Sequence, residues 1–320
     1  MEKNLLSTRT YYKPYWYLEA QEFTDSQQRV HWLADEVPLA SDLNDWKLKL
    51  TESEKNLIGN ILKSFAQTEV HVGNDYWIEK VAQAFKIPEI QEMAVTFAAM
   101  ECIHARAYFR LNEELGLEDV QAFMEDPATK AKIDRLTNTE SNTIEERILS
   151  LAIFSAFTEG VNLFSSFAIL MSFQLRNLMK GTGQIIEWSV RDESLHSKAG
   201  CWMFRTIINE NPQYNTPELK NQIIEACQLS VQLEYDFIDK AFEMGDIEGL
   251  SKEQLKNFIK ARANEKMIEL GYKAIYNDID PNLIKQMDWF GHLTSGKTHQ
   301  DFFAGRVTDY SKSTADWSDL

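Results

Sequence analysis

Two Glu-x-x-His steps limit the possible folds of this chain more than any other feature of its sequence. The first runs from Glu101 to His104, and the second runs from Glu193 to His196. On an α-helix, residues three and four positions apart share a face, so each glutamate points the same way as its histidine, and Tyr108 joins the first face. Burying such groups on an inward face is unfavourable unless they bind something. The pattern therefore predicts two helices that carry ligands.

A lone glutamate precedes each Glu-x-x-His step at a similar distance. Glu69 lies 32 residues before Glu101, and Glu159 lies 34 residues before Glu193. Each half of this faint repeat supplies one helix with a lone glutamate and one helix with Glu-x-x-His. Four glutamates and two histidines from four helices form the pattern that holds a pair of metal ions in a helical bundle. Iron and manganese favour such mixed ligands, whereas structural zinc sites prefer thiolates.

Within this pattern, the glutamates of the two Glu-x-x-His steps are expected to bridge the ions, and each histidine is expected to bind one ion. One Glu-x-x-His step alone is a weak indication, because such steps are frequent on exposed helices. Two of them, each preceded by a glutamate on an apolar helix, are specific. His71 and Asp75 are alternative ligands near Glu69, but neither fits the repeat as well.

The rest of the sequence is typical of long helices with few turns. The chain has 320 residues, of which 44% are apolar, 13 are glycine and 7 are proline. No segment shows a convincing strand alternation. We expect an aromatic-rich N-terminal segment over residues 1–50, a helical domain over residues 51–290 and a tail over residues 291–320. Helices are expected over residues 25–34, 51–85, 88–116 and 143–180, around Glu193 up to Asn211, and from residues 216, 251 and 280 onward.

Charge and cysteine content narrow the functional class. The formal charge of −16 argues against binding to nucleic acid or to anionic membranes. Three cysteines without a Cys-x-x-Cys pair argue against a disulfide framework, so each is expected to be a buried thiol. Residues 151–171 could pass for a membrane span, but Glu159 near the middle would cost roughly 2.5–3.5 kcal/mol there. A start without an apolar signal core completes the prediction of a cytoplasmic protein.

The chain resembles the small, radical-generating subunit of class I ribonucleotide reductase over essentially its whole length. The matching residues are Glu101-Cys-Ile-His104-Ala-Arg-Ala-Tyr108, then Glu159, then Arg191-Asp-Glu-Ser-Leu-His196. The resemblance implies an all-α, ferritin-like bundle with a dimetal-carboxylate core that activates oxygen. It also implies a stable radical on Tyr108, a homodimer, and a separate large subunit that reduces ribonucleotides to deoxyribonucleotides.

The resemblance further implies a path for long-range radical transfer. The family has an aspartate directly before the second Glu-x-x-His step, and Asp192 stands there. It has a tryptophan followed by an acidic pair near the N-terminus, which Trp32 matches and Trp46 matches less well. A tyrosine in the tail relays the radical to the large subunit, and Tyr310 is the candidate. Two apolar residues at the extreme C-terminus are expected to anchor the tail on that subunit: Trp317 and Leu320.

Two positions depart from the commonest family pattern. The first ligand is most often aspartate, whereas this chain has Glu69, as in a subgroup that uses a manganese–iron pair and lacks the radical tyrosine. We expect a pair of iron ions, with Mn/Fe and Mn/Mn as alternatives. The alternatives stay open because the longer glutamate side chain changes the coordination geometry, which affects metal choice. The radical pocket is apolar in the family. Leu163 and Phe167 match it, whereas Ser189 replaces an aliphatic residue.

Two other functions remain open at this level. A ferritin-like dimetal oxidase or oxygenase that acts on a small or acyl substrate would use the same ligands, but it would need neither Tyr108 nor Tyr310. A metal-storage or helical interaction protein would not bind two ions per chain in a closed site. The sequence contains no nucleotide-binding glycine-rich loop, which agrees with a substrate that lies on a partner subunit.

Overall fold

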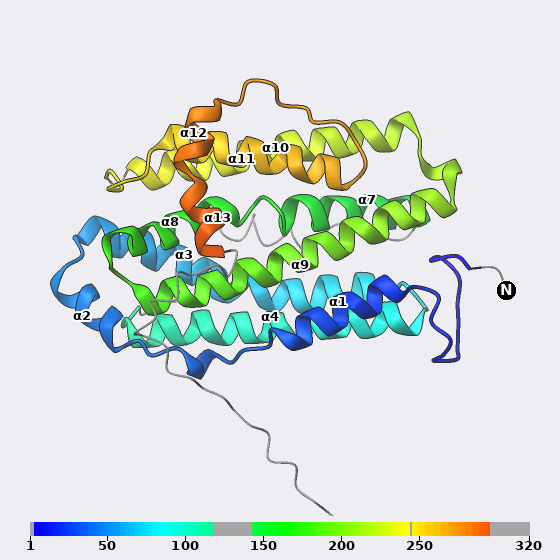
Figure 1. Cartoon of the computed structure of the whole chain (residues 1–320), viewed down its shortest axis with the longest axis horizontal. Coiled ribbons are helices and arrows are strands. Elements are labelled where there is room, and N and C mark those ends of the chain that lie inside the picture. Colours follow the sequence, from blue (N-terminus) through cyan, green and yellow to red (C-terminus); the bar gives the residue numbers. More distant parts are fainter. Residues whose placement is uncertain (1–2, 118–142, 244, 295–320) are drawn as a thin grey trace, which may run out of the picture.

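Most of the described part of the chain is helical, as predicted. The computed structural model describes residues 3–117, 143–243 and 245–294 (Figure 1). Within these ranges no β-strand forms, and the single β-bridge joins Ile247 to Leu250. The prediction of an all-α fold is therefore confirmed.

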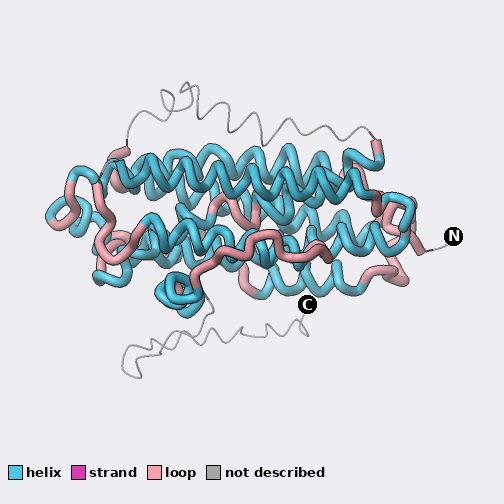
Figure 2. Tube along the Cα trace, turned by 90° about the horizontal axis from the view of Figure 1, so that it is seen from above, coloured by secondary structure: helices cyan, strands magenta, loops and turns pink. Residues whose placement is uncertain are grey.

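Long helices that run along one common direction form the bundle (Figures 1 and 2). Its centre contains α3 (Glu52–His71), α4 (Pro88–Glu114), α7 (Ile144–Ile153) and α9 (Lys180–Glu210). On one side α1 (Leu18–Arg29) packs against α4, and on the other α10 (Pro217–Glu243) pairs with α11 (Lys252–Glu269). The short α12 (Pro281–Gln286) leads to α13 (Asp288–Thr294), which crosses α9. The metal site predicted from the sequence therefore lies between layers of helices.

Three of the predicted helix starts, at residues 51, 143 and 251, have capping boxes. The side chains of Thr51, Thr143 and Ser251 each accept a hydrogen bond from the backbone N–H three residues later. The glutamate or glutamine at that later position reaches back to the N-cap backbone. Each box satisfies N–H groups that the helix leaves free at its start. These starts were readable because all the partners lie within four residues.

Both helices with a lone glutamate contain a π-helical segment, which the sequence did not predict. The α3 helix continues as η2 (Val72–Ala82), and α7 continues as η3 (Phe154–Thr158). The N–H of Glu159 bonds to the carbonyl of Phe154 at 3.0 Å, a five-residue step. Gly73 lets η2 approach α4 closely, because a Cβ there would lie 3.2 Å from Cβ of Glu101. Such π segments are frequent at functional sites.

The expected helix over residues 143–180 is wrong in its second half. The helix is interrupted by a turn after Glu159, continues as α8 (Phe164–Ser172) and η4 (Phe173–Arg176), and then reverses into α9. Residues 181–183, directly after the expected end of that helix, lie in the first turn of α9 (Lys180–Glu210). The cause is distant in sequence: the buried carboxylate of Asp42 accepts the N–H groups of Gly181 and Thr182, and Asp45 accepts that of Met179. These aspartates, on α2 (Ala40–Leu48), cap α9 from outside it.

The N-terminal helix also differs from its prediction. It spans Leu18–Arg29 rather than residues 25–34, because its buried face consists of Ala20, Thr24 and Gln27 instead of large apolar residues. Buried polar residues produce no periodic pattern of apolar residues from which a helix could be predicted. At the other end, α13 continues to Thr294, beyond residue 291 where the tail was expected to begin.

The apolar segment 151–171 lies inside the bundle. Phe157, Phe164 and Phe167 are fully buried within the core. Among the described residues, no helix is long and apolar enough to cross a membrane. The prediction of three buried thiols holds for Cys201 and Cys227 but is wrong for Cys102, which is exposed because it lies on the outward face of α4.

Candidate metal centre

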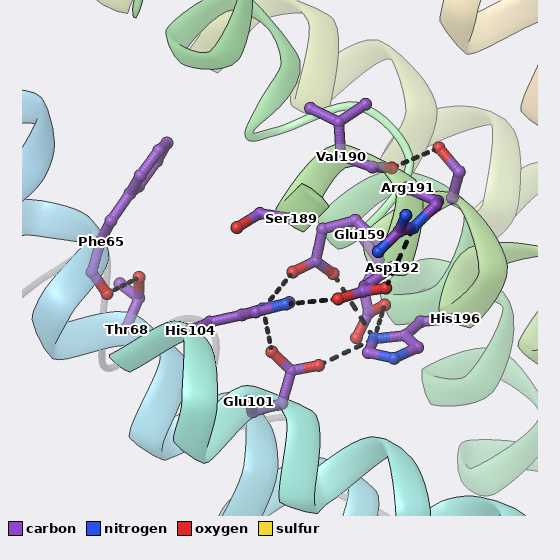
Figure 3. A network of polar contacts seen from close by, with 12 residues as sticks. Phe65, Thr68, Glu101, His104, Glu159, Ser189, Val190, Arg191, Asp192 and His196 are labelled. Carbon is purple, nitrogen blue, oxygen red and sulfur yellow. Dashed lines mark hydrogen bonds and ion pairs between the residues drawn. The ribbon is translucent and has the colours of Figure 1, made fainter. Parts of the chain in front are cut away.

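Six side chains from four helical segments converge at the centre of the bundle. Figure 3 labels Glu101, His104, Glu159 and His196 among them. Glutamate comes from the end of α3 and from the residue after η3, and α4 and α9 each supply one Glu-x-x-His step. All six are at most 1% exposed. They are the predicted set: Glu69, Glu101, His104, Glu159, Glu193 and His196.

The six residues form two overlapping groups, each compact enough for one metal ion. Position 1 consists of Glu69, Glu101, His104 and Glu193, and position 2 consists of Glu101, Glu159, Glu193 and His196. Within each group the candidate ligand atoms lie within 4.8 Å of one another. Glu101 and Glu193 belong to both groups, so they are placed to bridge two ions. The geometry thus suits a metal pair.

The two histidines present the same ring nitrogen to the shared carboxylates. Nδ1 of His104 lies 3.1 Å from Oε2 of Glu101 and 3.1 Å from Oε1 of Glu193. Nδ1 of His196 lies 2.8 Å from Oε1 of Glu101. In Figure 3, Glu101 reaches toward both rings. Each imidazole therefore keeps Nε2 free for a partner outside the site.

Atoms without hydrogen bonds show that the site fits a pair of cations. Five buried polar atoms here have no hydrogen-bond partner, although buried polar groups are normally paired. Their contacts with one another are short but poorly aligned for hydrogen bonds. Two divalent cations between four carboxylates would satisfy these atoms and balance the charge. The unpaired atoms are Oε1 of Glu69, Glu101 and Glu193, Oε2 of Glu159 and Nδ1 of His196.

The carboxylates of the metal-free site titrate very differently from one another. Burial raises the pKa of Glu69 well above its usual value, and the neighbouring Glu193 and Glu101 carboxylates raise it further. Burial, together with the Glu193 charge, also raises the pKa of Glu159 to about 8. Burial acts the same way on Glu193, but the close His104 and His196 imidazoles prevail and lower its pKa to about 2. Without metal, the cluster therefore holds protons near neutral pH.

In the metal-free site, the pKa values of both histidines are raised, so both rings bind protons more tightly than usual. Burial alone lowers the pKa of His104, but Asp192 and Glu101 outweigh it and raise the pKa well above its usual value. Burial likewise lowers the pKa of His196, and the Glu101 carboxylate reverses the effect. A metal ion would have to displace these protons.

Tyr108 lies beside position 1 in an apolar pocket. Its ring centroid is 6.4 Å from that of His104 and 5.1 Å from that of Phe65, which packs on Phe167. Tyr108 is fully buried, and its hydroxyl has no hydrogen-bond partner. Burial raises the pKa of Tyr108 well above its usual value, and the nearby Glu69 carboxylate adds to this shift. The buried Ser189 hydroxyl bonds to the carbonyl of Ile185. The phenol is thus shielded from water.

A hydrogen-bonded line leads from position 1 to Trp32. Nε2 of His104 lies 3.1 Å from Oδ2 of Asp192, and the Nε1–H of Trp32 donates to the same oxygen at 2.8 Å. The Trp32 ring also stacks on the imidazole, with centroids 5.7 Å apart. Arg110 of α4 donates to the carbonyl groups of Ala34 and Val37 and so holds the loop after Trp32.

Two functional neighbours were missed by the sequence reasoning. The Nε1–H of Trp77, on η2, donates to Oε1 of Glu159 at 2.9 Å. The amide of Gln27, on α1, lies between Asp192 and His196. Neither residue shares a helix with the group it contacts, so no local spacing could have identified it.

Other candidates lie apart from the site or outside the described residues. His71 and Asp75 pair with each other at 2.7 Å and belong to neither ligand group, and both remain about one-third exposed. Trp46 packs on the hydrophobic core, whereas Trp32 makes the bond to Asp192. Three predicted tail residues lie outside the described residues: Tyr310, Trp317 and Leu320.

The fold and the site define a class: helical bundles with a carboxylate–histidine centre suited to two metal ions. A sequence model of the family described as ribonucleotide reductase, small chain, matches residues 9–282. The chain therefore belongs to the ribonucleotide reductase small-chain family.

Individual relatives agree with this membership. A probable ribonucleoside-diphosphate reductase small subunit from Invertebrate iridescent virus 3 is 33% identical over 335 positions, which cover 98% of this chain and 88% of the relative. The beta subunit from Chlamydia pneumoniae is 27% identical and covers 88% of this chain and 84% of its own length.

Solved structures share the fold. The R2 subunit of ribonucleotide reductase from Clostridium botulinum superposes with a TM-score of 0.80 at 19% identity and covers 91% of this chain and 94% of its own. A structure described as dimanganese(II)-NrdF from Streptococcus sanguinis gives 0.73 at 19% identity and covers 87% and 100%. The predicted ferritin-like architecture of this family is confirmed.

Proposed function

We propose that Tyr108 carries the radical that this small subunit passes to its large subunit. The observation that supports this most directly is the position of Tyr108. It lies one helical turn after His104, fully buried, with an unpaired hydroxyl and an aromatic wall. A phenol in such a place is close to the metal pair and separated from reductants in water.

The metal pair, when bound, supplies the oxidising chemistry by activating oxygen or an oxygen-derived oxidant. The chain positions the ions and keeps water away from them. Glu101 and Glu193 would hold both ions, while Phe65 and Phe167 form a wall of the tyrosine pocket. Tyr108 would give one electron and its phenolic proton to the oxygen-derived oxidant and become a neutral radical. The protein is then ready to start the reduction of ribonucleotides on the large subunit.

The proposed transfer path leaves the site through Asp192 and Trp32. The carboxylate joins the His104 imidazole to the indole through two hydrogen bonds, both buried. From Trp32 the path continues to Tyr310 and then to a cysteine of the large subunit. In this proposal the end of the tail docks on that subunit through Trp317 and Leu320.

The test is electron paramagnetic resonance on full-length protein that has been loaded with metal and exposed to oxygen. The wild type should give a tyrosyl signal, and Tyr108→Phe should remove it while metal content stays near two ions per chain. Tyr76→Phe is the matched control, because Tyr76 is also buried but bonds to Ser155 at 3.3 Å. A signal that survives Tyr108→Phe but not Tyr76→Phe would contradict the assignment.

Two surface cavities give no support to the dimetal oxygenase. A substrate oxygenase needs an apolar channel that reaches the metals. One cavity, of about 300 Å³, lies between Phe164 and Phe290, and another, of about 610 Å³, lies along Val70 and Phe109. None of the six ligand candidates lines either cavity. Retained turnover with the large subunit in Tyr108→Phe would reopen this alternative.

The metals that we propose are two iron ions, with Mn/Fe and Mn/Mn as the alternatives to test. Mixed carboxylate and imidazole ligands suit both elements. The Streptococcus sanguinis relative is described as a dimanganese protein, so manganese is a reasonable competitor. Loading with each metal separately and in mixture, followed by metal analysis and the tyrosyl signal, would identify the active pair.

We further propose that two copies pair through the outer face of α4, in the cytoplasm. Six exposed residues alternate at steps of four and three along this face, the spacing of a helix–helix seam. The larger cavity lies beside it and could receive a side chain of the second copy. Phe109→Glu should convert a dimer to a monomer in size-exclusion chromatography with light scattering, whereas Leu229→Glu on α10 should not. The six residues are Val95, Ala99, Cys102, Arg106, Phe109 and Glu113.

A further inference from the structure

The two metal positions have the same kinds of ligand but different groups behind their histidines. Behind His104 lies the carboxylate of Asp192. Behind His196 lies the amide of Gln27. We propose that Gln27 positions His196 for metal binding and, being neutral, makes position 2 the weaker of the two positions. This inference rests on the dimetal part of the proposed function.

The contacts leave the amide only one orientation. The Nε2 amino group of Gln27 donates to Oδ1 of Asp192 at 3.0 Å, and its Oε1 lies 3.2 Å from Nε2 of His196. An ionised carboxylate can only accept hydrogen bonds, so the amino group must face Asp192. The amide oxygen must then face His196, and Nε2 of that ring must carry the hydrogen. All three side chains are fully buried.

This orientation determines which nitrogen binds metal. With the hydrogen held on Nε2, Nδ1 of His196 keeps its lone pair, and Nδ1 is the atom that faces Glu101 and Glu159. Asp192 does the same for His104, whose Nδ1 faces Glu101 and Glu193. Partners of this kind fix the ring orientation and the ligand atom. Gln27 is thus a positioning residue that acts through His196.

The charge of the backing group separates the two positions. A carboxylate behind an imidazole strengthens the hydrogen bond and makes the ring a better electron donor, whereas a neutral amide does so less. Glu101 and Glu193 are shared, and each position adds one further glutamate, so these ligands are balanced in type. Position 1 should therefore fill first.

The chain also makes position 2 depend on α1. Gln27 is the last buried residue of this helix, which packs on α4 and α9 from outside the four central segments. One carboxylate, Asp192, then contacts His104, Trp32 and Gln27. His196 therefore belongs to the same hydrogen-bond network as His104. His104 contacts Asp192 directly, whereas His196 reaches Asp192 through the Gln27 amide.

The experiment is a Mn²⁺ titration of metal-free, full-length protein by calorimetry, followed in parallel by electron paramagnetic resonance. Wild type should bind two ions in two steps whose affinities differ by about tenfold or more. The first equivalent should give a mononuclear spectrum, and the second should convert it to a coupled pair. Gln27→Met, which keeps the length but removes both hydrogen bonds, should weaken the second step by about 10- to 100-fold and leave the first within about threefold.

Two further variants test charge and specificity. Asp192→Asn removes the charge behind His104, so the first step should weaken and the two affinities should approach each other. Gln21→Met is the matched control, because Gln21 lies on the same helix but bonds to Asp25 within it; both steps should match the wild type. Thermal unfolding of each metal-free variant, followed by circular dichroism, checks that the fold is intact.

The possible failures can be told apart. If the wild type does not bind two ions, the dimetal function fails and this inference fails with it. If the wild type binds two ions but Gln27→Met weakens both steps equally, or neither, only the role of Gln27 is overturned. Equal affinities in the wild type would overturn the inequality of the two positions.

Discussion

The two halves of the metal centre have the same ligands and different surroundings. Each half has a lone glutamate next to a π-helical segment and a Glu-x-x-His step on a long helix. Beyond these ligands the likeness ends. Position 1 has a phenol and an indole joined to a carboxylate behind it, whereas position 2 is backed by an amide and packed by aromatic rings. The repeat builds the candidate metal site, and the asymmetry distinguishes the side along which we propose that oxidation travels.

Two of the buried tyrosines, Tyr108 and Tyr76, show this contrast. Tyr108 lies directly beside the His104 ring, and its hydroxyl is unpaired. Tyr76, on the side of position 2, packs against Trp77 and Phe154, and its hydroxyl meets that of Ser155. Trp77, rather than Tyr76, contacts the ligand Glu159. Burial alone is therefore not sufficient for the proposed role, which also needs a place beside the ring of a metal ligand.

The largest effect is expected from a change that affects both halves. Glu101→Gln keeps the shape but removes one of the two shared charges, so both ions should be lost together. Metal content should fall below one ion per chain, and turnover with the large subunit should fall at least about 1,000-fold, or about 4 kcal/mol in activation free energy. Glu92→Gln on the same helix is the control. Retention of one tightly bound ion would contradict the bridging role.

Replacing Trp32 is expected to lower turnover strongly while metal binding and the Tyr108 radical remain. Trp32→Phe removes the donor to Asp192 and the redox-active indole but keeps a ring against His104 and replaces no ligand, so the ions and the Tyr108 signal should remain. Turnover with the large subunit should fall at least about 100-fold, or about 2.7 kcal/mol. Trp46→Phe, the alternative relay, should keep most activity. The reverse result for these two tryptophans would move the path to Trp46.

The sequence predicted those parts of the molecule that depend on neighbours along the chain. Glu-x-x-His spacing and the capping boxes are local properties of helices, so they could be read directly. The reversal of the chain before α9 could not be predicted from the sequence, because Asp42 is about 140 residues from the N–H groups that it caps. Gln27 and Trp77 were missed for the same reason, since tertiary packing alone brings them to the ligands.

The pH dependence should differ between the metal-free and the metal-loaded protein. Without metal, the pKa values of His104 and His196 are raised by carboxylates, and the pKa of Glu159 is raised to about 8 by burial. A raised pKa contributes stability at low pH that is lost as the pH rises through the folded-state value. The metal-free protein should therefore unfold at lower temperature as the pH rises from 6 to 8.

The apparent affinity for metal, in contrast, should rise with pH. Each proton that an ion displaces from these groups makes the apparent affinity rise about tenfold per pH unit. The difference in unfolding temperature between loaded and metal-free protein should widen between pH 6 and pH 8, which calorimetry on both forms can measure. A difference that stays constant would show that the metal-free site holds no extra protons.

The smallest effect is expected at Trp77, which contacts only position 2. Trp77→Phe keeps a ring against Phe97 and His196 but removes the hydrogen bond to Glu159. Without that donor the carboxylate is less well oriented, so affinity at position 2 should fall about tenfold while position 1 is unchanged. The Tyr108 signal should fall only as far as the second ion is missing, and excess metal should restore it.

The control for this variant is Trp202→Phe, because Trp202 packs on Tyr17 and Phe23 away from the ligands. It should leave both Mn²⁺ affinities as in the wild type. If Trp77→Phe instead weakens both positions, the indole supports the whole bundle rather than one ligand. If excess metal fails to restore the radical, Trp77 takes part in oxidation itself, and the two halves differ less than their hydrogen bonds indicate.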